Sequence, residues 1–299
     1  LRDEYGKKCD YDKVAESWEL SCHKDGPSVV ADGEYKGLTL NEYIEKAGKG
    51  VLGKNCERFE NFPILIKLID AKDNLSVQVH PDNDYAMRVE GEYGKTEMWY
   101  VVDCDEGATL LYGFKHEITK EEFARRIADN TLLEVTNAVP VKKGDVFFIK
   151  SGTLHAIGKG ILIAEIQQNS NTTYRIYDYG RVGKDGKPRE LHVNKALDVT
   201  KLAPAEQYPE TPVEKKDGYD IKLLSKCEYF TTYRVNVETK AELDADENSF
   251  NSILVLEGEP VISGGETVSA KKGESVFISA GTGKYTVEGK CTFVLTKID

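Results

Sequence analysis

Short apolar runs separated by turn-forming residues dominate the chain. Lys-Lys-Gly-Asp at 142–145 and Gly-Gly at 264–265 are examples of the turns. Runs of this length, rich in Val, Ile and Phe and bounded by turns, are typical of β-strands. The pattern predicts strands at 63–69, 98–103, 146–150, 160–166, 231–237, 253–256, 275–279 and 291–296.

Two stretches, 39–47 and 119–130, have the pattern of helices. Both open with Thr-x-x-Glu, in which Glu42 and Glu122 are placed to complete a capping box. Sheet therefore predominates, and the sequence predicts a mainly β fold, a sandwich or barrel with a few short helices.

One internal repeat organises the chain. Residues 142–153 read KKGDVFFIKSGT and residues 271–282 read KKGESVFISAGT. An apolar strand and an acidic turn precede each copy, which indicates a duplicated β-barrel. The Pro-rich stretch 203–212 has the composition of a connector. We therefore expect two domains, 1–205 and 206–299.

The two copies differ where chemistry is expected. The first carries His155 just after its Gly-Thr, and the aligned position in the second is Lys284. The other histidines all lie at or before position 192. The sequence thus predicts a metal-binding catalytic domain followed by a domain without metal ligands.

Two further segments present polar side chains at strand spacing. Because side chains alternate in a strand, Ser76, Gln78 and His80 share one face, and Lys95 and Glu97 share another. Each of these residues taken alone has an ordinary structural explanation: His80 could be a histidine at a strand end, and Glu97 could be a surface carboxylate.

Taken together, Gln78, His80, Glu97 and His155 offer two imidazoles, a carboxylate and an amide oxygen. This mixed nitrogen and oxygen set suits Zn²⁺ and is compatible with Fe²⁺ or Mn²⁺. The absence of thiolates from the set favours an open catalytic site over a structural one.

The composition of the chain argues against some classes of binding partner. The net charge of −11 disfavours a nucleic-acid partner, although local cations can still bind a small anion. No apolar run approaches the roughly 20 residues of a membrane helix. Six scattered cysteines without a CxxC pair indicate reduced thiols and a cytoplasmic location.

The segment 163–181 is rich in tyrosine and arginine. Its tyrosines are explained by packing along a strand, whereas Arg175 and Arg181 are suited to bidentate contact with phosphate or carboxylate oxygens.

At these residues the chain resembles type I mannose-6-phosphate isomerases of the shorter bacterial kind. The resemblance runs from about residue 16 to the end and is densest at 16–37, 75–86, 94–101 and 152–181. It implies two cupin-type (jelly-roll) β-barrels and one Zn²⁺ per chain. The family's opening strand is largely absent, as expected for a trimmed start.

The resemblance also implies roles for individual residues. The metal ligands would be Gln78, His80, Glu97 and His155; Arg175 would be the active-site arginine; Glu165 and Lys95 would lie in the pocket; and Ser76 and Arg181 would face the sugar phosphate. Asn171 stands where many members carry an aspartate, so the proton-transfer role sometimes given to that aspartate does not carry over.

The implied reaction interconverts mannose 6-phosphate and fructose 6-phosphate through a cis-enediol. Glu165 is our candidate base, with a metal-bound hydroxide as the alternative. The expected partner is a small sugar phosphate, and the expected assembly is a monomer or homodimer. An iron-dependent dioxygenase and a non-catalytic sugar-phosphate-binding protein are the competing interpretations.

Overall fold

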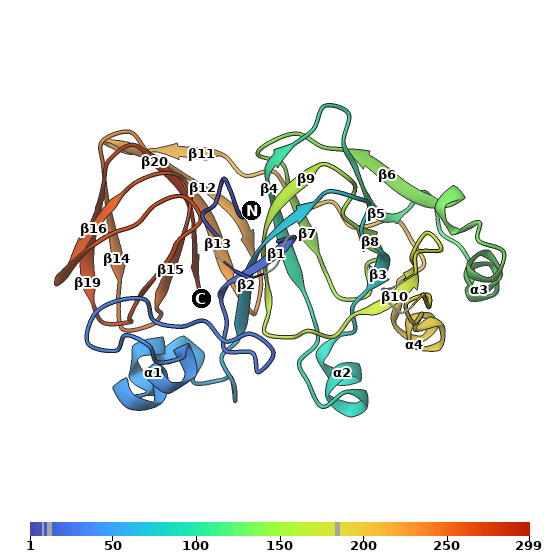
Figure 1. Cartoon of the computed structure of the whole chain (residues 1–299), viewed down its shortest axis with the longest axis horizontal. Helices are drawn as coiled ribbons and strands as arrows, with labels where there is room; N and C mark the ends of the chain where they lie inside the picture. Colours follow the sequence, from blue (N-terminus) through green and yellow to red (C-terminus); the bar gives the residue numbers. More distant parts are fainter. Residues whose placement is uncertain (8, 11–13, 183–185) are drawn as a thin grey trace. The chain divides into compact units, whose positions relative to one another are not determined.

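The computed structural model describes residues 1–7, 9–10, 14–182 and 186–299, which divide into two compact units (Figure 1). Unit 1 comprises Leu1–Leu68 and Pro209–Asp299, and unit 2 comprises Ile69–Tyr208. Residues 1–68 thus cluster with the C-terminal part, while the second boundary lies close to the predicted one. The assignment of catalytic and metal-free domains to 1–205 and 206–299 stays a prediction.

Strands predominate among the described residues, which confirms the mainly β class. Unit 1 contains β1 (Glu16–Leu20), the start of β2 (Ile64–Ala71), β11 (Val213–Lys215), β12 (Tyr219–Lys226), β13 (Thr231–Val237), β14 (Lys240–Ala245), β15 (Asn251–Gly258), β16 (Val261–Gly264), β17 (Glu266–Ser269), β18 (Ser275–Ile278), β19 (Gly283–Glu288) and β20 (Cys291–Lys297). Unit 2 contains the end of β2, β3 (Val77–Val79), β4 (Glu97–Cys104), β5 (Thr109–Phe114), β6 (Thr136–Pro140), β7 (Val146–Ile149), β8 (His155–Ala156), β9 (Ile161–Gln168) and β10 (Tyr174–Tyr177). All eight predicted strands are present.

The described residues form four α-helices: α1 (Leu40–Ala47), α2 (Asn83–Val89), α3 (Lys120–Ala128) and α4 (Val193–Val199). Three short 3₁₀ segments accompany them: η1 (Lys49–Leu52), η2 (Lys54–Cys56) and η3 (Leu132–Glu134). The capping box at Thr39 and Glu42 is complete, and Thr119 caps α3 by accepting from the N–H of Glu122 at 3.1 Å. The sequence pattern missed α2 and α4, whose seven residues each are too few for a clear helical period.

Unit 2 consists of two facing sheets. One has the order β2-β9-β4-β7, and the other has the order β10-β3-β8-β5-β6. Trp99 and Val101 from the first sheet and Leu110 and Tyr112 from the second belong to one buried apolar cluster. That cluster fills the space between the sheets.

Unit 1 contains a six-stranded sheet, β11-β12-β13-β20-β15-β18, and a four-stranded sheet, β14-β19-β16-β17. Val235, Ile253 and Phe293 from the larger sheet and Tyr285 and Val287 from the smaller one share a buried core. These sheets, like those of unit 2, are open and not closed barrels. The predicted pair of jelly-roll barrels therefore stays a prediction beyond the confirmed β class.

The sequence repeat corresponds to a repeat of local structure. In the first copy, the N–H of Lys142 donates to the carboxylate of Asp145 at 2.9 Å, which closes the turn. The N–H of Gly144 then donates to the carbonyl of Val101 at 2.8 Å, joining the turn to β4. Gly144 has a φ of 91°, a value that disfavours other residues.

The second copy makes the same bonds. The N–H of Lys271 donates to Glu274 at 3.0 Å, and the N–H of Gly273 donates to Val255 of β15 at 2.8 Å. Gly273 has a φ of 86°. Both turns lead into four-residue strands that pair antiparallel with the longer strand before them. The repeated sequence thus corresponds to a repeated pattern of local hydrogen bonds, while the duplicated barrel stays a prediction.

None of the helices in the described part of the chain combines the length and the apolar character needed to cross a bilayer.

We predict that Gly158→Ala destabilises the protein by about 3 kcal/mol in urea unfolding, because the added methyl group would overpack a filled site. A Cβ atom at Gly158 would lie 1.7 Å from the carbonyl oxygen of Thr109, which belongs to β5. The control is Gly50→Ala, where a Cβ atom meets nothing within 4 Å. Equal unfolding free energies for the two variants would contradict the prediction.

Candidate metal centre and active site

One row of residues crosses four strands of the second sheet of unit 2. Tyr112 on β5 lies opposite His155 on β8, His155 lies opposite Gln78 on β3, and Gln78 lies opposite Arg175 on β10. Residues directly opposite one another share a face of the sheet. Because Tyr112 belongs to the cluster between the sheets, the other side chains of the row start on the inner face as well.

The first sheet presents two carboxylates to the same interior. Glu97 is two residues before Trp99 on β4 and therefore shares its inner face. Glu165 on β9 lies opposite Trp99, so it shares that face too. Glu97 is 0% exposed and Glu165 is 2% exposed. Both acidic groups are thus placed inside a domain core.

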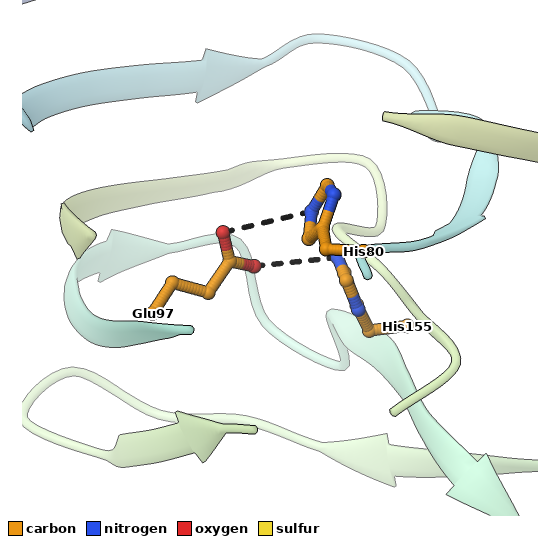
Figure 2. Close-up of side chains that lie close together, drawn as sticks. All are labelled: His80, Glu97 and His155. Carbon is orange, nitrogen blue, oxygen red and sulfur yellow. Dashed lines mark ion pairs between the residues drawn. The ribbon is translucent and has the colours of Figure 1, made fainter. Parts of the chain in front are cut away.

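His80, Glu97 and His155 converge on one point (Figure 2). One ligand atom from each lies within 4.8 Å of the others, and all three residues are buried. Nε2 of His80 is 3.7 Å from Oε2 of Glu97, and Nε2 of His155 is 3.3 Å from Oε1. The convergence predicted from strand faces is therefore observed for these three residues.

Backbone carbonyls fix how the two imidazoles are turned. Nδ1 of His80 lies 2.9 Å from the carbonyl oxygen of Thr172, and Nδ1 of His155 lies 2.8 Å from that of Thr153. A carbonyl only accepts, so each Nδ1 carries a proton, and in each ring the Nε2 atom faces Glu97. Burial lowers the pKa of His155 to about 4, which keeps this ring neutral at pH 7.

Two imidazole Nε2 atoms that face a buried carboxylate form a set of ligand atoms suited to a cation. Neither carboxylate oxygen of Glu97 accepts a hydrogen bond from the described residues, although Nζ of Lys95 forms an ion pair with Oε2 at 2.9 Å. Leaving buried acceptors in this state is costly. The donor set therefore fits a divalent metal ion with nitrogen and oxygen ligands.

Gln78 adjoins this cluster but presents its amide nitrogen. Its Nε2 atom lies 3.3 Å from Nε2 of His155, whose lone pair it meets as a donor. Coordination would need the amide oxygen there instead, which a half-turn about the last side-chain bond provides. The structure thus places Gln78 beside the candidate ligands, and its role as a fourth ligand stays a prediction.

Lys95, Glu165 and Trp99 form a connected group beside the cluster. Nζ of Lys95 lies 3.6 Å from Oε1 of Glu165, and the indole N–H of Trp99 donates to Oε2 of Glu165 at 2.8 Å. The Trp99 ring also contacts the imidazole of His155 edge to face, with ring centroids 5.2 Å apart. Trp99 was missing from the predicted site, although its spacing from Glu97 indicates a shared face.

Gln167 is a second residue that the sequence did not single out. It lies opposite Glu97 and is 0% exposed. Its Nε2 atom donates to the carbonyls of Gln168 and Ser170, both at 2.7 Å, so the orientation of the amide is fixed. Its Oε1 atom accepts no hydrogen bond in the described part of the chain. Ser76 is likewise buried, just before β3.

Three arginines surround one buried carboxylate near the end of β10. Arg181 and Arg189 both bind Asp178, the latter from Nε at 2.7 Å. Arg181 also donates to the carbonyl of Asn74 at 2.7 Å. Burial, together with Arg189 and Arg181, lowers the pKa of Arg175. The sequence analysis singled out Arg175 and Arg181 but neither Arg189 nor Asp178, the carboxylate that Arg181 and Arg189 share.

Two family models match the chain. The model described as "Phosphomannose isomerase type I, catalytic domain" matches residues 6–107, and "Mannose-6-phosphate isomerase, cupin domain" matches residues 220–298. The predicted cupin type is thereby confirmed for the C-terminal part.

Individual relatives match over nearly the whole length. Mannose-6-phosphate isomerase ManA of Bacillus subtilis is 38% identical over 297 residues, which cover 99% of this chain and 93% of that protein. Mannose-6-phosphate isomerase of Streptococcus mutans is 39% identical, covering 93% of this chain and 86% of that protein.

The crystal structure of the mannose 6-phosphate isomerase from Bacillus subtilis superposes with a TM-score of 0.93 at 37% identity, covering 99% of this chain and 93% of that one. The resemblance read from the motifs and the expected enzyme class are both confirmed. The chain belongs to the type I mannose-6-phosphate isomerase family.

Proposed function

We propose that this chain interconverts mannose 6-phosphate and fructose 6-phosphate with the help of one bound Zn²⁺. The observation that carries the proposal is the buried convergence of His80, Glu97 and His155, with the Nε2 atoms of both imidazoles turned to the carboxylate. Family membership supplies the substrate class. An iron-dependent dioxygenase would use the same ligands but would leave the neighbouring arginines without a substrate group to bind.

His80, Glu97 and His155 would hold the metal, with Gln78 as the fourth protein ligand. Nitrogen and oxygen donors of this kind suit Zn²⁺, and Fe²⁺ and Mn²⁺ are the competing ions. When bound, the ion acts as a Lewis acid that stabilises negative charge on a sugar oxygen.

The protein groups around the cluster would move the proton and balance the charge. In the open-chain sugar, a proton leaves the carbon next to the carbonyl and returns to the other carbon by way of a cis-enediol, so no atom is gained or lost overall. Glu165 is the candidate base, because its carboxylate is buried and oriented by Trp99. Lys95 and Arg175 would stabilise the developing negative charge in this water-poor interior.

Arg181 and Ser76 are proposed to contact the substrate. A phosphate monoester carries about −1.5 to −2 charges at neutral pH. The three guanidinium groups around Asp178 exceed the single negative charge of that carboxylate, so the region has positive charge to spare for an anion. Both guanidinium groups bound to Asp178 remain partly exposed and retain further N–H donors.

We also propose that the chain forms two barrels, that catalysis takes place within residues 1–205, and that the protein is cytoplasmic. The proposal of a metal-free C-terminal part rests on Lys284, which stands where the first repeat carries His155. All six cysteines are free thiols, as expected in a reducing compartment.

We predict that the purified protein contains one metal ion per chain and that a chelator abolishes isomerase activity on mannose 6-phosphate, which added Zn²⁺ restores. His155→Ala should lose the ion, because it removes a ligand from a buried site. The matched control, His116→Ala, changes an exposed histidine and should retain both metal and activity. Full activity of metal-free protein would refute the proposal.

Arg175→Ala should lower kcat by about 10²–10³-fold, the range for loss of one preorganised charge-stabilising donor. Its metal content, measured by atomic absorption, should equal that of the wild type, since Arg175 is not a proposed ligand. Arg125→Ala provides the control, because that side chain is 66% exposed on α3. Loss of metal from the Arg175 variant would show that the residue supports the metal centre instead.

If Glu165 is the base, Glu165→Gln should reduce kcat by about 10²–10⁴-fold while the metal stays bound. Exchange of the substrate's transferred hydrogen with deuterium from solvent, followed by NMR, should slow in parallel. Glu121→Gln on the exposed side of α3 is the matched control. Unchanged exchange would favour a base other than Glu165.

A further inference from the structure

The imidazole of His192 binds the backbone of Arg175. His192 precedes α4 at the N-cap position, where side chains often accept a hydrogen bond from the first helical turn, yet it makes no such bond. Its Nδ1 atom instead accepts a hydrogen bond from the N–H of Arg175 at 3.2 Å. The N–H of His192 donates to the carbonyl oxygen of Arg175 at 2.8 Å. One residue thus satisfies both polar groups of the Arg175 backbone.

These two bonds fix an outer strand at the candidate active site. β10 is the last strand of its sheet and pairs with β3 on one side. Arg175 lies opposite Gln78, and because its backbone groups bind His192, they point away from β3. The two residues therefore form a non-hydrogen-bonded pair, the kind in which facing side chains lie closest. His192 holds the strand at the residue beside the metal cluster.

The pairing of β10 with β3 is weak without this support. It consists of three residue pairs, and the register shifts between Arg175 and Tyr177. The segment containing His192 also holds the guanidinium group, since Nη1 of Arg175 donates to the carbonyl of Glu190 at 3.1 Å. The His192 ring contacts the ring of Tyr174, with centroids 6.1 Å apart. Residues 190–192 therefore restrain both the backbone and the guanidinium group of Arg175.

The guanidinium group of Arg175 keeps a buried donor that a ligand can bind. Its Nε atom is buried and forms no hydrogen bond with the described residues. A buried donor without an acceptor costs about 1–3 kcal/mol, so such a group is expected to meet a substrate oxygen. The Nε atom of Arg175 meets a substrate oxygen in the same geometry at each turnover only if β10 is held in place.

We propose that His192 is a positioning residue, whose neutral imidazole accepts the Arg175 N–H and thereby keeps the guanidinium group aimed at the sugar phosphate. This inference rests on the proposed function, because it takes Arg175 as a group that acts on the substrate. A backbone N–H only donates, so Nδ1 of His192 carries no proton and Nε2 carries it. The residue acts through Arg175 and does not itself contact the reacting atoms.

A matched pair of substitutions tests this role. In His192→Asn the side-chain oxygen occupies the same position along the side chain as Nδ1 and preserves an acceptor, whereas His192→Leu has the shape of Asn without one. We expect kcat for mannose 6-phosphate to fall about 10–100-fold in the Leu variant, since small misplacements of a catalytic group cost up to about 100-fold, and to stay within about threefold in the Asn variant. Metal content should match the wild type in both.

A double-mutant cycle separates positioning from general support of the fold. If His192 acts through Arg175, adding His192→Leu to Arg175→Ala should cause no further loss of kcat. Additive losses, wild-type kcat in the Leu variant, or equal impairment of the Asn and Leu variants would each overturn the inference. His192→Ala replaces the Leu variant if the latter does not fold.

The cycle also distinguishes this inference from the proposed function. A wild-type protein that does not isomerise mannose 6-phosphate would refute the proposed function itself. An active wild type, an impaired Arg175→Ala variant and a fully active His192→Leu variant would refute the role of His192 alone.

Discussion

A carboxylate buried beside the Nε2 atoms of two imidazole rings is the constraint on which the rest of unit 2 depends. Glu97 occupies an inward position on β4, in line with the apolar Trp99 and Val101. Burying an ionised group costs several kcal/mol even after the protein relaxes, and an ion pair with Lys95 offsets part of that cost. The strand register must therefore keep Glu97 close to His80 and His155, where a cation can offset the rest of that cost. A slip of one residue in register would turn Glu97 to the opposite face.

Backbone groups do much of the organisation around this point. Carbonyls of Thr153 and Thr172 set the tautomers of the two histidines, and the indole of Trp99 orients Glu165. The outer strand β10 is held in a similar way, because His192 forms hydrogen bonds with both the N–H and the carbonyl of Arg175. His80, His155, Glu165 and the backbone of Arg175 are thus each oriented by a hydrogen-bond partner, and such fixed polar groups are what a preorganised site requires.

The repeated segment has the same local structure in both copies, and the candidate metal ligand His155 follows the first copy. The turns before β7 and β18 make the same hydrogen bonds, so the backbone of the repeat is preserved. The side chains that follow differ in their surroundings. His155 on β8 lies opposite Gln78, whereas Lys284 on β19 lies opposite Asp244. The position aligned with a candidate metal ligand thus carries a lysine in the second copy.

The sequence by itself determined the features that depend on neighbouring residues. Apolar runs between turns located the strands, a capping box located α1, and the alternation of side chains selected Gln78, His80 and Glu97. The helices α2 and α4 were not predicted, because a helix of seven residues shows little periodicity in its sequence. Helices of that length depend on tertiary packing for stability, and here Ala86 and Ala196 are the buried residues.

Tertiary structure alone decided which groups face one another across strands. The hydrogen bond from Trp99 to Glu165 joins residues 66 positions apart, and that from Arg175 to His192 spans 17 positions and ends on a side chain that does not cap its own helix. The contact of Gln78 with His155 likewise follows from the pairing of β3 with β8, since the two residues are 77 positions apart. No local pattern encodes such contacts, because strand register and burial are set by the packing of the whole domain.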